Sequence, residues 1–293
     1  MCKWTNLFSL VMVGLVFAAS ALAAPLQPLG SIVDLSIEGR ASIIGPNVPP
    51  PATYRQSSST TSVTDCEVRL QAGVTAGQLP AVQSTASSRA VAGVDLKRVA
   101  PNEYMLTISS KALGNLVKVT EPSYVNGDYN ALSRAHLQAD FVLLDTPLMP
   151  QGAPATVFLH LEHAGSLMGF NRGMSTSKAD LVVRGLDAYE YHNSLILPSI
   201  MPPGFDEYEV RGSRNFAQDA IVKSVIGGRL SLTADLTSTA TGYLSAQEPI
   251  SKRGSAADFD SGLRLHMLVM PEPGMAALLA LGLTVVARRR RGV

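Results

Sequence analysis

The stretch Leu263-Arg264-Leu265-His266-Met267-Leu268-Val269 decides the fold, because its side chains alternate between apolar and polar types. The apolar positions are Leu263, Leu265, Met267 and Val269, and Arg264 and His266 lie between them. Successive side chains of an extended chain point to opposite faces. An alternation of period two is therefore typical of an antiparallel strand with one buried face and one solvated face. The sequence predicts such a strand here.

The same alternation recurs toward the N-terminus. Its apolar positions are Val33, Leu35 and Ile37; Tyr104, Leu106 and Ile108; Val157, Leu159 and Leu161; and Leu230, Leu232, Ala234 and Leu236. Residues that favour turns separate these runs, at 126–128, 147–154, 169–173, 198–204, 227–228 and 258–262. Many short strands between turns predict an all-β fold, an antiparallel β-sandwich with a jelly-roll-like arrangement among its options. Residues 214–226 fit either a short amphipathic helix or a strand.

The character of the sequence changes just after the last predicted strand. Pro271, Glu272 and Pro273 precede an uncharged run at residues 274–287, and Arg288, Arg289, Arg290 and Arg291 follow it. At about 1.5 Å per residue such a helix rises roughly 21 Å, less than the roughly 30 Å of a bilayer's hydrocarbon core. A short run with a cationic end suits transient insertion, with the arginines held on the cytoplasmic side. A simple tail anchor, or a buried helix with a basic end, is the alternative.

This order of Pro-Glu-Pro, short apolar helix and arginine cluster resembles the PEP-CTERM sorting signal. The resemblance covers residues 271–293, with Met270 standing where a β-branched residue is common. It implies export by a Gram-negative bacterium that makes exopolysaccharide. It also implies recognition and removal of the tail by an exosortase, a membrane protease-transpeptidase, and delivery to the cell surface or extracellular matrix. Ectodomains of this family differ widely, so the resemblance implies a localisation for the protein but no activity.

The N-terminus has the pattern of a secretory signal peptide. Lys3 supplies the positive start, residues 7–19 the apolar core, and Ala21 and Ala23 the small residues that precede cleavage. We expect cleavage after Ala23, with an uncleaved signal anchor as the alternative. The predicted organisation is a signal peptide at 1–23 with its helix, an ectodomain at 24–270, and a sorting segment with a transmembrane helix at 271–293.

The net charge of the whole chain differs from that of its body, which is the part between the two terminal segments. The formal net charge is +1, but Lys3 and the four C-terminal arginines lie in the two terminal segments, as does Glu272. The remaining 19 basic and 22 acidic residues leave a net charge of −3. A body of this kind has no basic surface for nucleic acid, so we expect no nucleic-acid partner.

Cys66 is the one cysteine that remains after Cys2 leaves with the signal peptide. It alternates with charged neighbours as the inward face of a strand would, which favours burial over intermolecular pairing or catalysis. Around this strand we expect an exposed Pro/Ser/Thr-rich loop near residues 45–93. That polar tract cannot bury enough apolar surface to order itself, and it either carries O-linked sugar or is plainly solvated.

No group in the body identifies a reaction. His160, Glu162 and His163 suggest a metal site, but strand geometry places His163 on the opposite face from the other two, so we interpret them as surface residues. Two acidic groups could suggest calcium sites. We interpret the first, Asp206, Glu207 and Glu209, as the outer face of a strand. We interpret the second, Asp258 and Asp260, as part of a turn. Five of the tyrosines fit core packing better than sugar stacking; they are Tyr124, Tyr129, Tyr189, Tyr191 and Tyr208. We predict no catalytic residue, no metal and no cofactor.

The sequence thus favours an exported surface or matrix protein with a structural or adhesive role. Its expected partners are an exosortase during transit through the inner membrane, and then exopolysaccharide or surface proteins. A secreted hydrolase displayed by the same route, and a permanently membrane-anchored periplasmic protein, are the alternatives.

Overall fold

The computed structural model describes twelve strands and no other regular element within its described residues. Those residues are 26–44, 50–62, 66–78, 82–95, 103–118, 126–147, 149–171, 173–197, 209–244 and 252–271. The strands are β1 (Leu26–Ile44), β2 (Ala52–Ser62), β3 (Cys66–Gln78), β4 (Val82–Asp95), β5 (Glu103–Lys118), β6 (Asn126–Leu143), β7 (Pro154–Phe170), β8 (Met174–Arg184), β9 (Ala188–Leu197), β10 (Glu209–Val225), β11 (Arg229–Leu244) and β12 (Lys252–Pro271). The segments predicted to form a signal helix and a sorting helix lie outside the described residues.

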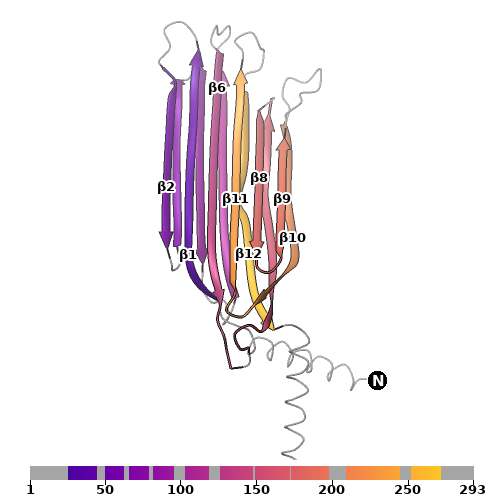
Figure 1. Cartoon of the computed structure of the whole chain (residues 1–293). Coiled ribbons are helices and arrows are strands. Elements are labelled where there is room, and N and C mark those ends of the chain that lie inside the picture. The colour runs from indigo at the N-terminus through magenta and orange to yellow at the C-terminus, as the bar shows by residue number, and fades with distance from the viewer. Residues whose placement is uncertain are drawn as a thin grey trace, which may run out of the picture.

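The strands form two six-stranded sheets that pack face to face as a β-sandwich (Figure 1). Sheet A has the order β2-β1-β6-β11-β8-β9, and sheet B has the order β10-β7-β12-β5-β4-β3. All pairs are antiparallel. The predicted all-β sandwich is confirmed.

The last eight strands pair in a nested order. β5 pairs with β12, β6 with β11, β7 with β10, and β8 with β9, and these pairs alternate between sheet B and sheet A. The four N-terminal strands widen this unit, because β1 and β2 extend sheet A beside β6, while β4 and β3 extend sheet B beside β5.

The predicted alternations form the core. In β12, Leu263, Leu265, Met267 and Val269 are all buried, whereas Arg264 is exposed. The apolar positions predicted on β1, β5, β7 and β11 are buried as well, and they pack with those of β12 in one cluster. Because side chains of a strand alternate between its faces, both sheets turn their apolar residues inward and their polar residues to solvent.

The Pro/Ser/Thr-rich segment differs from the predicted loop. It contains β2, β3 and β4, and β2 pairs with β1 without a register shift. An edge strand needs only a backbone partner on one side, so hydroxyl side chains that bury little apolar surface can still be ordered there. In β3, Val68 and Leu70 pack against the core while Glu67 and Arg69 are exposed, as predicted around Cys66. The backbone of Cys66 is described as the start of β3, but the burial of its side chain is not.

Three further segments resolve or correct the sequence predictions. Residues 214–225 belong to β10, which pairs with β7 along its length, so the strand alternative is right. Residues 126–128 begin β6 instead of forming a turn. The predicted turn at 258–262 is a β-bulge inside β12, where the pairing with β5 shifts register between Phe259 and Leu263. The predicted turn at 147–154 leads from the β6–β7 connection into the first residue of β7, and that at 227–228 lies in the connection between β10 and β11.

Both ends of the described body lie at the same end of the sandwich, the lower end in Figure 1. Leu26 pairs with Leu143, the last residue of β6, and Pro271 pairs with Ala155 at the start of β7. The Tyr104 hydroxyl donates a hydrogen bond to the Leu26 carbonyl and so joins sheet B to sheet A there. We call this the terminal end, and the opposite end the distal end.

We predict that Gly262→Ala destabilises the protein more than Gly152→Ala does. Both glycines have positive φ, 55° and 82°, so each alanine is strained by about 1 kcal/mol or more. A Cβ at Gly262 would also lie 1.8 Å from the Ile108 carbonyl oxygen, whereas at Gly152 nothing lies within 4 Å. Urea unfolding should show a loss of about 1 kcal/mol for Gly152→Ala and clearly more for Gly262→Ala. Equal losses would mean that the bulge can relax.

Candidate functional site

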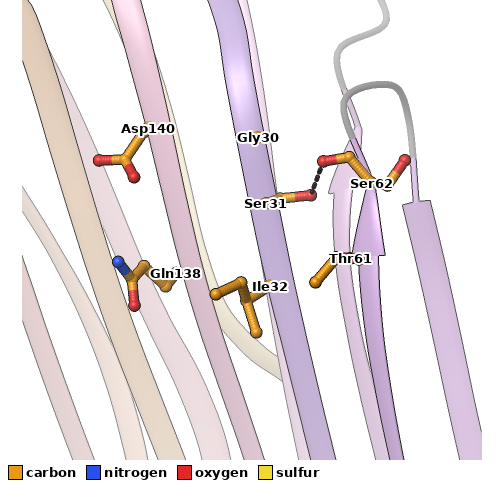
Figure 2. A pocket seen from close by; sticks show the side chains of 7 residues that line it. All are labelled: Gly30, Ser31, Ile32, Thr61, Ser62, Gln138 and Asp140. Carbon is orange, nitrogen blue, oxygen red and sulfur yellow. Dashed lines mark hydrogen bonds between the residues drawn. The ribbon is translucent and has the colours of Figure 1, made fainter.

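A hollow on the outer face of sheet A, near the terminal end, is the first part of the candidate site (Figure 2). It measures about 530 Å³ and is lined by residues of β1, β2 and β6. Ile32 of β1 lies between Thr61 of β2 and the longer Gln138 of β6, and Gly30 lies beside Asp140 of β6. At its edge the Ser31 hydroxyl donates to the Ser62 carbonyl at 3.1 Å, which holds β2 against β1.

A second hollow of about 320 Å³ continues along the same three strands and reaches β11. In register, Asp34 lies between Ser59 of β2 and His136 of β6, one outward-facing row beyond Ile32. The next row contains Ser36, Ser57 and Arg134. We call the two hollows together the sheet A groove, lined by Gly30, Ile32, Asp34 and Ser36 of β1, by Ser57, Ser59 and Thr61 of β2, and by Arg134, His136, Gln138 and Asp140 of β6.

The groove arises from a difference in side-chain length. Outward positions of β1 and β2 carry mainly glycine, serine, threonine and aspartate, while those of β6 carry arginine, histidine and glutamine. Short side chains leave the surface low over β1 and β2, and the longer side chains of β6 form a wall beside them. The groove is consequently a property of the outer face and is separate from the packed interior.

One row of the groove belongs to a polar line that crosses all six strands of sheet A. The register places Ser59, Asp34, His136, Asp235, Asp180 and His192 side by side. Asp235 and Asp180 are direct neighbours of like charge, an unfavourable pairing that nearby cations offset. His136 Nδ1 lies 2.7 Å from Asp235, His192 Nδ1 lies 2.8 Å from Asp180, and Lys178 Nζ lies 2.7 Å from Asp180.

The aspartates shift the titration of their histidine partners. The hydrogen bond to the Asp235 carboxylate raises the pKa of His136, and that to the Asp180 carboxylate raises the pKa of His192. On sheet B the hydrogen bond to the Asp219 carboxylate, at 2.6 Å, likewise raises the pKa of His160. Each partner stabilises the protonated imidazole. The three pairs therefore gain positive charge at a higher pH than isolated histidines would.

His163 corrects the sequence interpretation, because it is a core residue and not a surface one. It is only 1% exposed, and it packs against Phe259 and Tyr191. Its Nδ1 lies 2.9 Å from the Tyr191 hydroxyl, while its Nε2 has no hydrogen-bond partner. Its position shares the parity of Val157, Leu159 and Leu161 on β7, so the alternation itself was the signal that could have identified it. His160 and Glu162 do face outward, as predicted.

The other predicted candidates are distributed as follows. Pro271 is the last residue of β12, and Tyr129 and Tyr191 are buried, which confirms core packing for these two. Asp258 and Asp260 lie near Lys111, whose pKa is raised chiefly by its hydrogen bond to Asp258. The candidates outside the described residues are Ala21, Ala23, Tyr124, Asp206, Glu207, Tyr208, Glu272, Pro273, Arg288, Arg289, Arg290 and Arg291.

Two negative findings apply to the described part of the chain alone. It contains no group of three or more His, Cys, Asp or Glu residues placed to hold a metal ion. No helix with the length and apolar character needed to cross a membrane occurs in it either.

Comparison with known proteins gives little further information. No family model matches the chain, and no curated protein does. Two structures of infectious bursal disease virus align with this chain. That of the Gt strain has 10% sequence identity and covers 93% of this chain and 76% of its own. That of the Gx strain has 11% identity and covers 92% of this chain and 90% of its own. Their TM-scores of 0.16 and 0.13 are too low to support an inference about fold or function.

We predict that His163 makes the protein sensitive to acid. Burial lowers the pKa of His163 to about 4 from the usual 6.5, so the unfolded chain takes up this proton first as the pH falls. The stability that His163 contributes is complete above about pH 6.5 and decreases as the pH approaches 4, by roughly 2 to 3 kcal/mol at pH 4.5. Urea unfolding at pH 7 and pH 4.5 should show a smaller loss for His163→Phe than for the wild type. An identical pH dependence of the two proteins would contradict this assignment.

Proposed function

We propose that this chain is an exported protein of a Gram-negative bacterium, sorted to the cell surface or extracellular matrix, with a structural or adhesive role and no catalytic one. The sequence motifs at both ends motivate the proposal. In this view the sandwich is the ectodomain, residues 271–293 serve transit, and the part that follows the prolines is then removed.

One observation carries the proposal: β12 ends at Pro271, where the sorting motif begins. β12 lies in the middle of sheet B, between β7 and β5. A cut after the prolines would keep every described pair of β12, the last of which joins Pro271 to Ala155. The sandwich could therefore be released without loss of any strand.

The position of the two ends of the described body adds support. Leu26 and Pro271 both lie at the terminal end, so a chain held by either terminal segment would present the distal end away from the membrane. An exosortase would meet the chain at the terminal end during transient insertion into the inner membrane. The outer faces of the sheets and the distal end would then be available to exopolysaccharide or other surface proteins.

The nested strand order fits a display role. We infer that β5 to β12 form a jelly roll, since pairs that alternate between two sheets are the pattern of a folded-over hairpin. The four N-terminal strands then broaden the two outer faces of this jelly roll.

Tail removal provides the test. The chain ending at Pro271 keeps all of β12, so we expect it to fold but to fail to reach the cell surface, while the full chain is delivered and loses its C-terminus. A matched variant with Arg288, Arg289, Arg290 and Arg291 changed to Gln keeps the apolar run and removes only the cationic stop, and it should also be delivered poorly. Cell fractionation and mass spectrometry of the surface material measure both effects.

Two results would overturn the proposal. One is equal delivery of the truncated and full chains. The other is an intact Arg-terminated peptide in the surface material, which would favour a permanently membrane-anchored protein. A hydrolase displayed by the same route would be delivered identically, so it is separated by assaying the purified chain for hydrolysis of polysaccharide and peptide substrates.

A further inference from the structure

The sheet A groove has the length and position of a binding site for an extended chain. Its outward rows, from Gly30 to Ser36 along β1, are two residues apart, and three such steps span about 20 Å. β1 and β6 are interior strands whose backbone groups are engaged in ladders on both sides. A ligand in the groove would therefore meet side chains and could not add to the sheet as a further strand.

The groove offers both donors and acceptors in close succession. Ser59 and Thr61 hydroxyls and the Gln138 amide can each donate and accept, whereas the Asp34 carboxylate only accepts and the Arg134 guanidinium only donates. Such a lining matches a ligand whose surface carries hydroxyl groups at regular intervals. It matches an apolar ligand poorly, because Ile32 is the one large aliphatic side chain that faces outward among the lining residues.

The charges in the groove nearly balance. Asp140 is held by the Arg229 guanidinium, with N–O distances of 2.7 and 3.2 Å, and Asp235 is paired with His136. Asp34 and Arg134 then contribute one charge of each sign. A strongly charged polymer of either sign would gain little from this balance, so the electrostatics favour an uncharged ligand.

From these observations we propose that the sheet A groove binds a linear, neutral polysaccharide laid along β1. This sharpens the adhesive role proposed above and rests on it for its biological setting, although the binding itself does not depend on sorting. Several sugar units would contact the groove at once, so affinity should rise with chain length until the groove is filled.

Calorimetric titration of the full chain tests this, in a detergent without a sugar headgroup. The probes are linear neutral hexasaccharides of glucose, mannose and galactose, with their disaccharides, and the hexamers of galacturonate and glucosamine as charged comparisons. We expect at least one neutral hexasaccharide to bind about tenfold or more tightly than its disaccharide and than either charged hexamer.

A matched pair of variants locates the binding. Ser36→Lys places a long side chain in the groove, and Ser194→Lys makes the same change in the same row of sheet A but on β9, outside the groove. Ser36→Lys should weaken binding at least tenfold while Ser194→Lys leaves it unchanged, with equal unfolding midpoints. Gln138→Ala should weaken binding by roughly two- to tenfold, as expected for one lost hydrogen bond.

Three results would overturn the inference: no binding of any neutral hexasaccharide, preference for a charged hexamer, or equal effects of the two lysine variants. These outcomes are separable from failure of the sorting proposal. Undisturbed delivery of the truncated chain would remove the sorting proposal while leaving the titrations as they are, and absent binding would leave the localisation results as they are.

Discussion

Strand parity is the constraint on which the rest of this structure depends. Each residue of a strand is assigned to one face, and antiparallel register carries that assignment across a whole sheet. In sheet B the row of β12 that holds Leu265 joins Leu161 of β7 and Leu106 of β5, and all three are buried. A shift by one residue would exchange the core for the solvent face. The same rule that builds the interior therefore also builds the two outer faces.

The contrast between His163 and His160 illustrates this. They are three residues apart on β7, so one lies inside the sandwich and the other on its surface. Inside, desolvation keeps the His163 imidazole neutral over most of the pH range, whereas outside, Asp219 favours the charged form of His160. The pKa values of two identical side chains are thus shifted in opposite directions, and position relative to the sheet decides the direction.

The outer face of sheet A derives its character from residues that contribute nothing to the core. Ser59, Asp34 and His136 come from three strands and meet only because β1 lies between β2 and β6. The proposed sorting route and the proposed polysaccharide site use different parts of the molecule, the terminal end and this outer face. Removal of the tail at the terminal end would leave the outer face of sheet A exposed, so the sorting route and the polysaccharide site are physically compatible.

The sequence alone determined the all-β class, the inward residues of the clear strands such as Leu230 and Leu265, and the motifs at the chain ends, because alternation and motif order are local properties. It could not decide the segment at 214–226, and it assigned a loop where β2 to β4 lie, because a polar or ambiguous strand is ordered by its neighbour and not by its own composition. The alternation along β7 indicates that His163 faces the core, although its polar neighbours His160 and Glu162 suggested a surface position. Only the tertiary structure decided which strands are adjacent, and so which outward side chains form a groove, because pairings between distant strands such as β1 and β6 leave no trace in either segment.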